Sequence, residues 1–371
     1  MEFLILVFIT SFFVVLLSTP SLIKVAILKR LFDAPGDTRK LHTRMIPTIG
    51  GIIIFAGTVF SYSLWFPTVR INELHNTALL MKAMDDYKFI LSTLLVMFFV
   101  GVKDDIIGTA PVKKLVAHVL VGMVLVLMAD IRIVSMHGIF GIDVLPYWAS
   151  VFLSLFTYIV VVNAFNLIDG VDGLAGGVGF IASSAFGAWF ALAGDYAMAG
   201  LAIALSGSLF GFLFFNFSPA KIFMGDSGSL TIGLIISILA IKLISYDVSA
   251  IHNEFILNVS KPVFAMAVLV YPLIDTLRIF IYRAVQGVSP FSADRNHLHH
   301  RLIDIGCSHK KAVIIIYSVN VFMIGLTLAL STISYMNANY SLVIIAVTAL
   351  FIAQIPFFIS KKKNRTVSEN D

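Results

Sequence analysis

The sequence has little charge and almost no cysteine. Only 13% of its 371 residues are charged, whereas 59% are hydrophobic, and soluble domains carry roughly 25% charged residues. A chain of this length cannot bury so much apolar surface in one core, because much of any folded domain faces its solvent. We therefore expect lipid to be part of that solvent. The single cysteine, Cys307, excludes an internal disulfide and fits no zinc-ligand spacing.

The sequence shows no signs of a cleaved secretory leader or of internal repeats. The first 17 residues have no basic n-region, and no small-residue cleavage site follows them, so we interpret them as a retained helix rather than a cleaved signal peptide. No repeat of roughly 20–50 residues is visible, which argues against a solenoid or a doubled transporter. The modest net charge of +5 gives no reason to expect a nucleic-acid partner.

Apolar segments of spanning length account for most of the chain and predict an all-α polytopic membrane protein. The eleven candidate spans are residues 3–25, 48–66, 88–102, 115–130, 147–165, 174–193, 196–215, 229–246, 261–282, 312–334 and 341–360. We expect one transmembrane domain over residues 1–360 and a short basic and polar tail at 361–371. Residues 131–146 alternate in polarity and contain Gly and Pro, which predicts a small extracytoplasmic hairpin.

The distribution of positive charge predicts the orientation. If the N-terminus is outside, 18 of the 26 Lys and Arg residues lie in segments on the inner side. Cytoplasmic loops carry such an excess of positive charge. The sequence therefore predicts a plasma-membrane (inner-membrane) protein with an outside N-terminus and a cytoplasmic C-terminus.

Two neighbouring carboxylates, Asp104 and Asp105, end the third span. Successive helical residues point about 100° apart, so the two acids cannot both be ordinary partners of Lys103. They are candidates for a general base or a metal-site carboxylate. The alternative is an interfacial charged cap.

Amides and acids recur at the end of the fifth span. Asn163, Asn166 and Asp169 follow one another every three residues, which places them along one stripe of a helix. Asp172 can cap the next helix, whose N-terminus favours anions. The pattern favours a ligand site, and a polar reversal between helices is the alternative.

A third cluster, Gly225-Asp226-Ser227-Gly228-Ser229, surrounds one acid with small residues. It lacks the P-loop pattern. One carboxylate in such a loop suits Mg²⁺, which keeps several waters and binds through one or two protein oxygens and substrate phosphates. A helix-capping aspartate is the alternative.

The fourth cluster covers residues 289–301 and contains His297, His299 and His300. Three histidines suggest zinc, but Arg295 and Arg301 flank them, and guanidinium groups beside imidazoles favour phosphate. We expect an anion site, with zinc or a plain solvated loop as alternatives. A further basic loop at 33–42 either enforces topology or meets a phosphorylated ligand.

These motifs, in this order and at these helix ends, resemble the polyprenyl-phosphate N-acetylhexosaminyl-1-phosphate transferase superfamily. They are D-D at 104–105, N-x-x-N-x-x-D-G-x-D-G-L-A at 163–175, F-M-G-D-x-G-S at 223–229 and D-R-N-H-L-H-H at 294–300. The H-x-H-H form is similar to the bacterial branch that starts enterobacterial common antigen, O-antigen and teichoic acid linkage units. This form argues against UDP-MurNAc-pentapeptide as the donor.

The resemblance implies a Mg²⁺ site, open to Mn²⁺, with Asp226 as principal ligand and Asn166 assisting. It implies that Phe223 stacks on uracil, that Asp172 reads the uracil edge and that Asp104 is a candidate base. Lys114 matches a lysine near the lipid phosphate, whereas His118 stands where the family often has glutamine. The candidate catalytic residues are Asp104, Asp105, Asp226 and His299. The candidate substrate-binding residues are Asn163, Asp169, Asp172, Phe223, Arg295, His297, His300, Arg301 and Lys114.

The activity implied by the resemblance is transfer of N-acetylglucosamine 1-phosphate from UDP-GlcNAc to undecaprenyl phosphate, with release of UMP. Another UDP-2-acetamido sugar is an alternative donor, and a lipid-phosphate transporter or flippase is the alternative class. Transporters place their sites near the bilayer midplane, whereas these clusters lie at helix ends on one side. Histidines that face a diphosphate are expected to be charged, so donor affinity should fall above neutral pH. A homodimer is compatible with the sequence.

Overall fold

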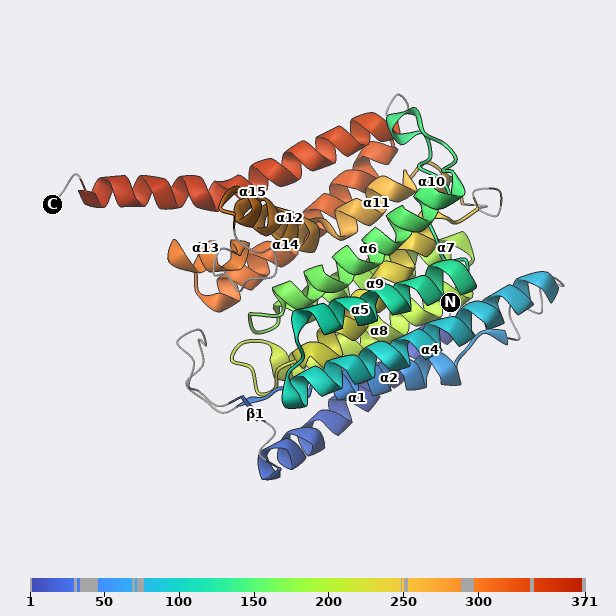
Figure 1. Ribbon diagram of the computed structural model, residues 1–371, viewed down its shortest axis with the longest axis horizontal. Coiled ribbons are helices and arrows are strands. Elements are labelled where there is room, and N and C mark those ends of the chain that lie inside the picture. The colour runs from blue at the N-terminus through green and yellow to red at the C-terminus, as the bar shows by residue number, and fades with distance from the viewer. Residues whose placement is uncertain are drawn as a thin grey trace. The chain divides into compact units, whose positions relative to one another are not determined.

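The predicted apolar segments form helices in the structure, a computed structural model of the chain (Figure 1). It describes residues 2–29, 32–33, 46–68, 71, 77–247, 249, 253–287, 297–333 and 337–368. The chain divides into two compact units. Unit 1 comprises Met1–Ser135 and Val144–Leu257, and unit 2 comprises Met136–Asp143 and Asn258–Asp371.

Unit 1 is built mainly from long apolar helices. In chain order they are α1 (Glu2–Leu28), α2 (Gly51–Leu64), α4 (Thr77–Ile107), α5 (Pro111–Met123) with its π-helical continuation η1 (Val124–Met128), α6 (Tyr147–Ile168), α7 (Leu174–Ala193), α8 (Tyr196–Asn216), α9 (Gly225–Ile244) and the short α10 (Glu254–Leu257). The two-residue strands β1 (Phe32–Asp33) and β2 (Ile46–Pro47) pair antiparallel.

Helix α9 forms the core of unit 1. Nearly all of its residues are buried, and it packs against α2, α4, α6, α7 and α8. A helix that is apolar or small around its whole circumference is a buried helix. By contrast, α1 and α6 expose large apolar side chains such as Leu17 and Phe152. Exposed apolar surface on this scale indicates contact with lipid.

A buried ion pair joins α4 to α9 at one end of unit 1. The Lys242 ammonium contacts the Asp86 carboxylate, and both side chains are largely buried. At the same end, the Tyr246 hydroxyl donates to the Ala193 carbonyl at 3.0 Å. Buried ionic groups need partners of this kind. Three of the four clusters predicted from the sequence lie at the opposite end of unit 1, where α4 ends and α9 begins.

Unit 2 contains a bent pair of helices and a helical hairpin. Its helices are α11 (Lys261–Val268), α12 (Val270–Val285), α13 (Leu298–Asp304), α14 (His309–Ser331) and α15 (Ala338–Ser368). The axes of α11 and α12 differ by 74°. Pro272 explains the bend, because it has no N–H to donate to the carbonyl of Val268 and its ring crowds that carbonyl.

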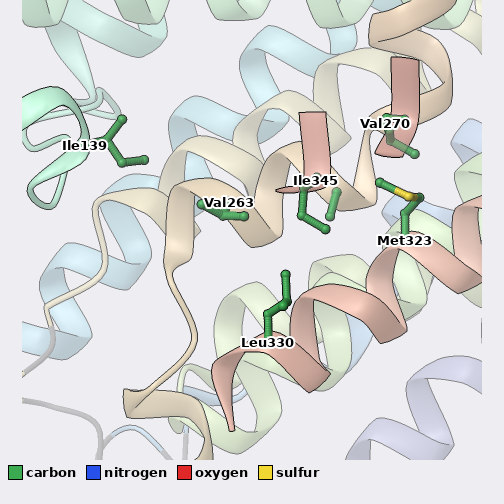
Figure 2. Packing of buried hydrophobic residues seen from close by; sticks show 8 residues of the cluster. Ile139, Val263, Val270, Met323, Leu330 and Ile345 are labelled. Atoms are coloured by element: carbon green, nitrogen blue, oxygen red, sulfur yellow. The ribbon is translucent and has the colours of Figure 1, made fainter. Parts of the chain in front are cut away.

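An aliphatic cluster holds the helices of unit 2 together (Figure 2). Val263 and Val270 come from the bent pair, Met323 and Leu330 from α14, and Ile345 from α15, and all five are buried. Ile139 of the segment 136–143 joins the same cluster. These side chains form an ordinary apolar core, and burial of apolar surface supplies much of the stability of such a unit.

The predicted spans are confirmed as helices, and their count is partly supported. Each of the eleven segments contains a helix or the bent pair. Within the described residues, eight helices are long and apolar enough to cross a membrane, or nine if the bent pair is one span. Helix α2 is apolar but shorter. The chain is therefore an all-helical, multi-pass membrane protein.

The hairpin expected at 131–146 is present. Ser135 and Val144 form an isolated antiparallel bridge, and the Leu145 N–H donates to the Val134 carbonyl at 2.9 Å. A short 3-10 helix, η2 (Ile139–Gly141), closes the turn. Of the basic loop at 33–42, the structure describes only the backbone of Asp33, in β1, and the rest lies outside the described residues.

Candidate active site

Three of the four predicted clusters meet at one end of unit 1. They come from the end of α4, the start of α5, the end of α6 and the start of α9. Hydrogen bonds and ion pairs between residues more than 60 positions apart in the sequence link these ends. The expectation that the polar residues gather on one side is confirmed for this unit.

Lys114 joins the first cluster to the third. Its ammonium lies 2.8 Å from Asp104 Oδ2 and also contacts Asp226 Oδ2. All three side chains are mostly shielded from solvent. The second oxygen of Asp104, Oδ1, is buried and has no partner among the described residues. One cation thus sits between two carboxylates that retain bonding capacity, which favours a further cationic or hydrogen-bonding ligand.

Asp105 has a different geometry from its neighbour. Its Oδ1 accepts the Asp226 N–H at 2.6 Å, and its Oδ2 accepts the Ser227 N–H at 3.0 Å. Both N–H groups belong to the first turn of α9, where backbone donors have no partner inside the helix. Asp105 therefore fixes the start of α9 and the position of Asp226. A catalytic role for Asp105 stays a prediction.

Glycine permits this close approach of α4 and α9. A Cβ atom on Gly101 would lie 2.5 Å from Ser227 Cα, so only glycine fits there. Gly225 has φ +70°, and a Cβ atom on it would lie 2.2 Å from the Thr48 carbonyl oxygen. The small residues around Asp226 are thus explained by packing at the helix start.

The three polar residues predicted to form a stripe on α6 have different surroundings in the structure. The Asn166 amide donates to Ser229 Oγ at 3.0 Å, which places it beside the start of α9. Asn163 instead donates to the Ile159 carbonyl of its own helix at 2.8 Å. Asp169 follows the last residue of α6, and burial together with the charges of Asp226 and Asp105 raises its pKa well above the ordinary value. Asp169 therefore lies in the field of the same acidic site.

Asn216 connects the loops that carry Asp172 and Phe223. Its Oδ1 accepts the Gly173 N–H at 3.0 Å, and its amide donates to the Ile222 carbonyl at 2.9 Å. Asp172 Oδ2 accepts the Ala220 N–H at 3.0 Å, while its Oδ1 is buried without a partner among the described residues. The Phe223 backbone pairs with Pro47 and Gly50. Both candidate uracil-binding residues are therefore held by the same pair of loops.

The acidic site fits a magnesium ion. Asp104, Asp105 and Asp226 are drawn together with one lysine, Lys114, so negative charge is in excess. Among the described residues, no group of three or more His, Cys, Asp or Glu side chains is arranged to hold a metal. Mg²⁺ does not need such a cage, because it binds through one or two carboxylates plus water and substrate phosphates.

The fourth cluster lies in unit 2 and is anchored by α12. Asp275 of α12 is completely buried, and its Oδ2 accepts a hydrogen bond from His297 Nδ1 at 2.7 Å. Its Oδ1 accepts the Leu298 N–H at 2.7 Å, at the start of α13. One turn earlier on α12, the Tyr271 hydroxyl lies 3.2 Å from His299 Nδ1.

The remaining basic residues of this cluster extend along α13. The rings of His299 and His300 have centroids 4.2 Å apart. The Arg301 guanidinium lies over the Phe357 ring and 3.6 Å from the Asp304 carboxylate. Arg295 lies outside the described residues. Asp275 contacts Nδ1 of His297, and Tyr271 contacts Nδ1 of His299. These two nitrogens are therefore already in use, which the zinc alternative did not take into account.

The expectation of a charged His299 is not supported in this state of the protein. Burial, with a smaller contribution from the neighbouring His300, lowers the pKa of His299 to about 3. The imidazole is therefore neutral at pH 7, and any contact that it makes with an anion is a contact by a neutral N–H group.

Neither Tyr271 nor Asp275 was predicted as a site residue, because both lie inside an apolar span. An acid in such a span is itself a signal, since ionisable groups at membrane depth are costly. His118, four residues after Lys114 on α5, is also buried, and neither ring nitrogen has a partner among the described residues.

These features define a polytopic membrane protein whose polar site, built from helix ends, suits a phosphorylated ligand. The chain belongs to glycosyl transferase family 4, whose model matches residues 87–244. It is 32% identical to the probable undecaprenyl-phosphate N-acetylglucosaminyl 1-phosphate transferase of Bacillus subtilis, over 97% of this chain and 94% of that protein.

Two further relatives have related names. The decaprenyl-phosphate N-acetylglucosaminephosphotransferase of Mycolicibacterium smegmatis is 33% identical, over 86% of this chain and 80% of that protein. The undecaprenyl-phosphate alpha-N-acetylglucosaminyl 1-phosphate transferase of Yersinia pestis is 28% identical, over 79% of this chain and 75% of that protein. The superfamily expected from the motifs is thus confirmed.

Proposed function

We propose that this protein transfers N-acetylglucosamine 1-phosphate from UDP-GlcNAc to a polyprenyl phosphate, with undecaprenyl phosphate as the acceptor. The names of the relatives support this reaction. The single observation that carries the proposal is the Lys114 ammonium between the Asp104 and Asp226 carboxylates at converging helix ends. That arrangement can hold phosphate groups and a divalent cation together.

The reaction forms one bond and breaks another at the β-phosphorus of the donor. An oxygen of the lipid phosphate attacks this phosphorus, and the bond to the bridging oxygen breaks as UMP leaves. A phosphate monoester has a second pKa of about 6, so the acceptor is largely ionised at neutral pH and needs little help from a base. Asp104 then acts chiefly on the position of the acceptor, through Lys114.

Asp226, assisted by Asn166, would hold Mg²⁺ in this site. When bound, the ion supplies neutralisation of charge on the diphosphate as the leaving group departs. The Asn166 amide nitrogen is used by Ser229, which leaves the carbonyl oxygen as the atom able to face a cation. Lys114 places a second positive charge beside the same phosphates.

The uridine end of the donor would lie against the loops that Asn216 connects. Phe223 offers an aromatic face for uracil. Oδ1 of Asp172, which has no partner in the part of the chain that the structure describes, offers an acceptor for a uracil N–H. Phe223 lies shortly before Asp226 in the sequence, and Asp172 lies shortly after Asn166. Hydrogen bonds hold the two loops together. The donor would thus span from the base pocket to the cation.

The proposed topology has eleven crossings with the active site at the cytoplasmic face of the plasma membrane. The distribution of Lys and Arg supports it. A soluble, charged donor and a membrane acceptor can only meet at such an interface. Single-domain organisation over residues 1–360 remains our prediction.

The test is transfer by purified protein in detergent, with UDP-GlcNAc and undecaprenyl phosphate. We expect stoichiometric UMP and a lipid-linked GlcNAc diphosphate. A panel with UDP-GalNAc and other 2-acetamido sugars identifies a different donor if UDP-GlcNAc is poor. If no sugar nucleotide yields UMP or lipid product, transferase activity is rejected and lipid-phosphate transport in vesicles becomes the hypothesis to test.

A further inference from the structure

Two side chains one turn apart on α12 contact two histidines of the fourth cluster. The Tyr271 hydroxyl lies 3.2 Å from His299 Nδ1, and Asp275 Oδ2 lies 2.7 Å from His297 Nδ1. All four residues are less than one-tenth exposed. The two imidazole rings are parallel, with an interplanar angle of 6° and centroids 5.3 Å apart. The contacts on Nδ1 therefore decide what each ring presents at its other nitrogen.

The direction of the Tyr271–His299 hydrogen bond follows from the needs of the hydroxyl. A buried O–H group that donates to no acceptor loses the hydrogen bond it had in water, which costs free energy. Among the described residues, His299 Nδ1 is the acceptor within reach of the Tyr271 oxygen. The hydroxyl therefore donates, and Nδ1 of His299 accepts with its lone pair.

This direction fixes the tautomer of His299. A neutral imidazole carries its single hydrogen on one nitrogen only, so acceptance at Nδ1 puts the hydrogen on Nε2. That nitrogen is buried and has no partner among the described residues. His299 therefore presents an N–H donor that the described part of the protein leaves unused.

Asp275 imposes the opposite arrangement on His297. A carboxylate only accepts, so His297 Nδ1 must donate to it. Partners of this kind set the tautomer and the orientation of an imidazole. Because Asp275 also accepts the Leu298 N–H, one carboxylate holds both the start of α13 and the ring of His297.

We propose that Tyr271 is a positioning residue that fixes His299 as an Nε2–H donor to a phosphate oxygen of the substrate. The proposal rests on the transferase function proposed above. It explains how a buried imidazole takes part in binding an anion without carrying charge. The phosphate belongs either to the sugar nucleotide or to the lipid acceptor, and the two sources are separated by their KM values.

Isosteric replacements of His299 test the position of the donor. The glutamine amide nitrogen can take the place of Nε2, whereas the asparagine amide nitrogen takes that of Nδ1. We expect His299→Gln to keep most of kcat/KM and His299→Asn to lose about 10- to 100-fold, the loss of a hydrogen bond to a charged group. The substrate whose KM rises in His299→Asn is the one that is contacted. Equal activities of the two variants would overturn the proposal.

Tyr271→Phe tests the hydroxyl, with Tyr282→Phe on the exposed part of α12 as the control. We expect the same KM to rise at least several-fold in Tyr271→Phe and to stay unchanged in the control. Nitrogen-15 NMR of the histidine-labelled protein should show an unprotonated Nδ1 for His299, assigned by its loss in His299→Gln. A protonated Nδ1, or a normal KM in Tyr271→Phe, rejects the proposal. Wild-type protein that releases no UMP rejects the transferase function instead.

Discussion

The Asp105 carboxylate accepts the backbone N–H of Asp226 at 2.6 Å and so ties the end of α4 to the start of α9. Its adjacent neighbour in sequence, Asp104, makes no such bond and faces Lys114 instead. Two identical side chains at consecutive positions are therefore assigned different tasks by geometry. Asp105 orients the residue that we expect to hold the metal, and Asp104 belongs to the charged site itself.

Asp105→Asn should lower both stability and turnover. The amide presents an N–H₂ group where the first turn of α9 needs an acceptor, and one buried donor left unsatisfied costs ~1–3 kcal/mol. We expect a lower thermal midpoint in detergent together with a lower kcat. Asp104→Asn should reduce kcat with little change in the midpoint, and Asp85→Asn, an exposed position on α4, should change neither. An Asp105→Asn protein of normal stability but without activity would assign Asp105 to the chemistry.

The helix ends of unit 1 could be predicted from the sequence because polar residues there are conspicuous against apolar spans. Counting the crossings places Asp104, Asn166 and Asp226 on the same side of the membrane, and the structure brings them together. The distinction between Asp104 and Asp105 could not be predicted, since it depends on which carboxylate reaches α9, more than 100 residues later.

The contacts that α12 makes with the histidine segment could not be predicted from the sequence for a related reason. Asp275 and Tyr271 lie in an apolar helix more than 20 positions before their partners. The hydrophobic pattern predicts the helix, but it does not predict which residues beyond the following loop this helix contacts. The pKa of His299 likewise depends on its burial in the fold, whereas the composition of the motif alone suggests a charged cluster.

Asp226→Asn should abolish transfer and weaken binding of a divalent cation. Loss of a ligand to an ion that neutralises the leaving diphosphate removes several kcal/mol of transition-state stabilisation, on the order of 10³-fold in kcat. Binding of Mn²⁺, followed by electron paramagnetic resonance, gives a readout independent of activity. Asp130→Asn, at the opposite end of the α5–η1 helix, serves as the control. Full turnover of the wild-type protein in EDTA would refute the metal assignment.

Phe223→Ala should raise the KM for UDP-GlcNAc while leaving kcat nearly unchanged. Stacking of a base on an aromatic ring contributes ~1–3 kcal/mol and is similar in the ground and transition states, so its loss acts on binding. Phe214→Ala, an exposed apolar position on α8, should leave both constants unaltered. A normal KM combined with a collapsed kcat would show that the ring serves the reaction step rather than the base.

Cys307 offers a direct test of the orientation, because it is the single cysteine of the chain. It is partly exposed in the connection between α13 and α14, which we expect on the cytoplasmic side. A membrane-impermeant maleimide should therefore label it only after permeabilisation. A Cys307→Ser/Phe140→Cys protein carries its thiol at an exposed hairpin position and should react in intact spheroplasts. Labelling of Cys307 in intact spheroplasts would invert the topology.

His299 should make the stability of the protein fall in mild acid. An unfolded histidine has a pKa of about 6.5. Burial beside Tyr271, together with the smaller effects of His300, His297 and Arg278, outweighs the opposing charge of Asp275 and lowers the pKa of His299 to about 3. Between these two pH values the unfolded state binds a proton that the folded state does not, so the free energy of unfolding decreases as the pH falls.

The decrease in the free energy of unfolding that is due to His299 is small, so it must be measured against a variant that lacks this histidine. One pH unit below 6.5, at pH 5.5, the penalty from His299 is about 1.4 kcal/mol, and at pH 7.5 it is close to zero. The thermal midpoint of the wild-type protein in detergent should therefore drop more between pH 7.5 and 5.5 than that of His299→Gln, which cannot be protonated. Parallel curves for the two proteins would mean that the folded protein protonates His299 as readily as the unfolded chain does, which would contradict a buried imidazole that stays neutral in mild acid.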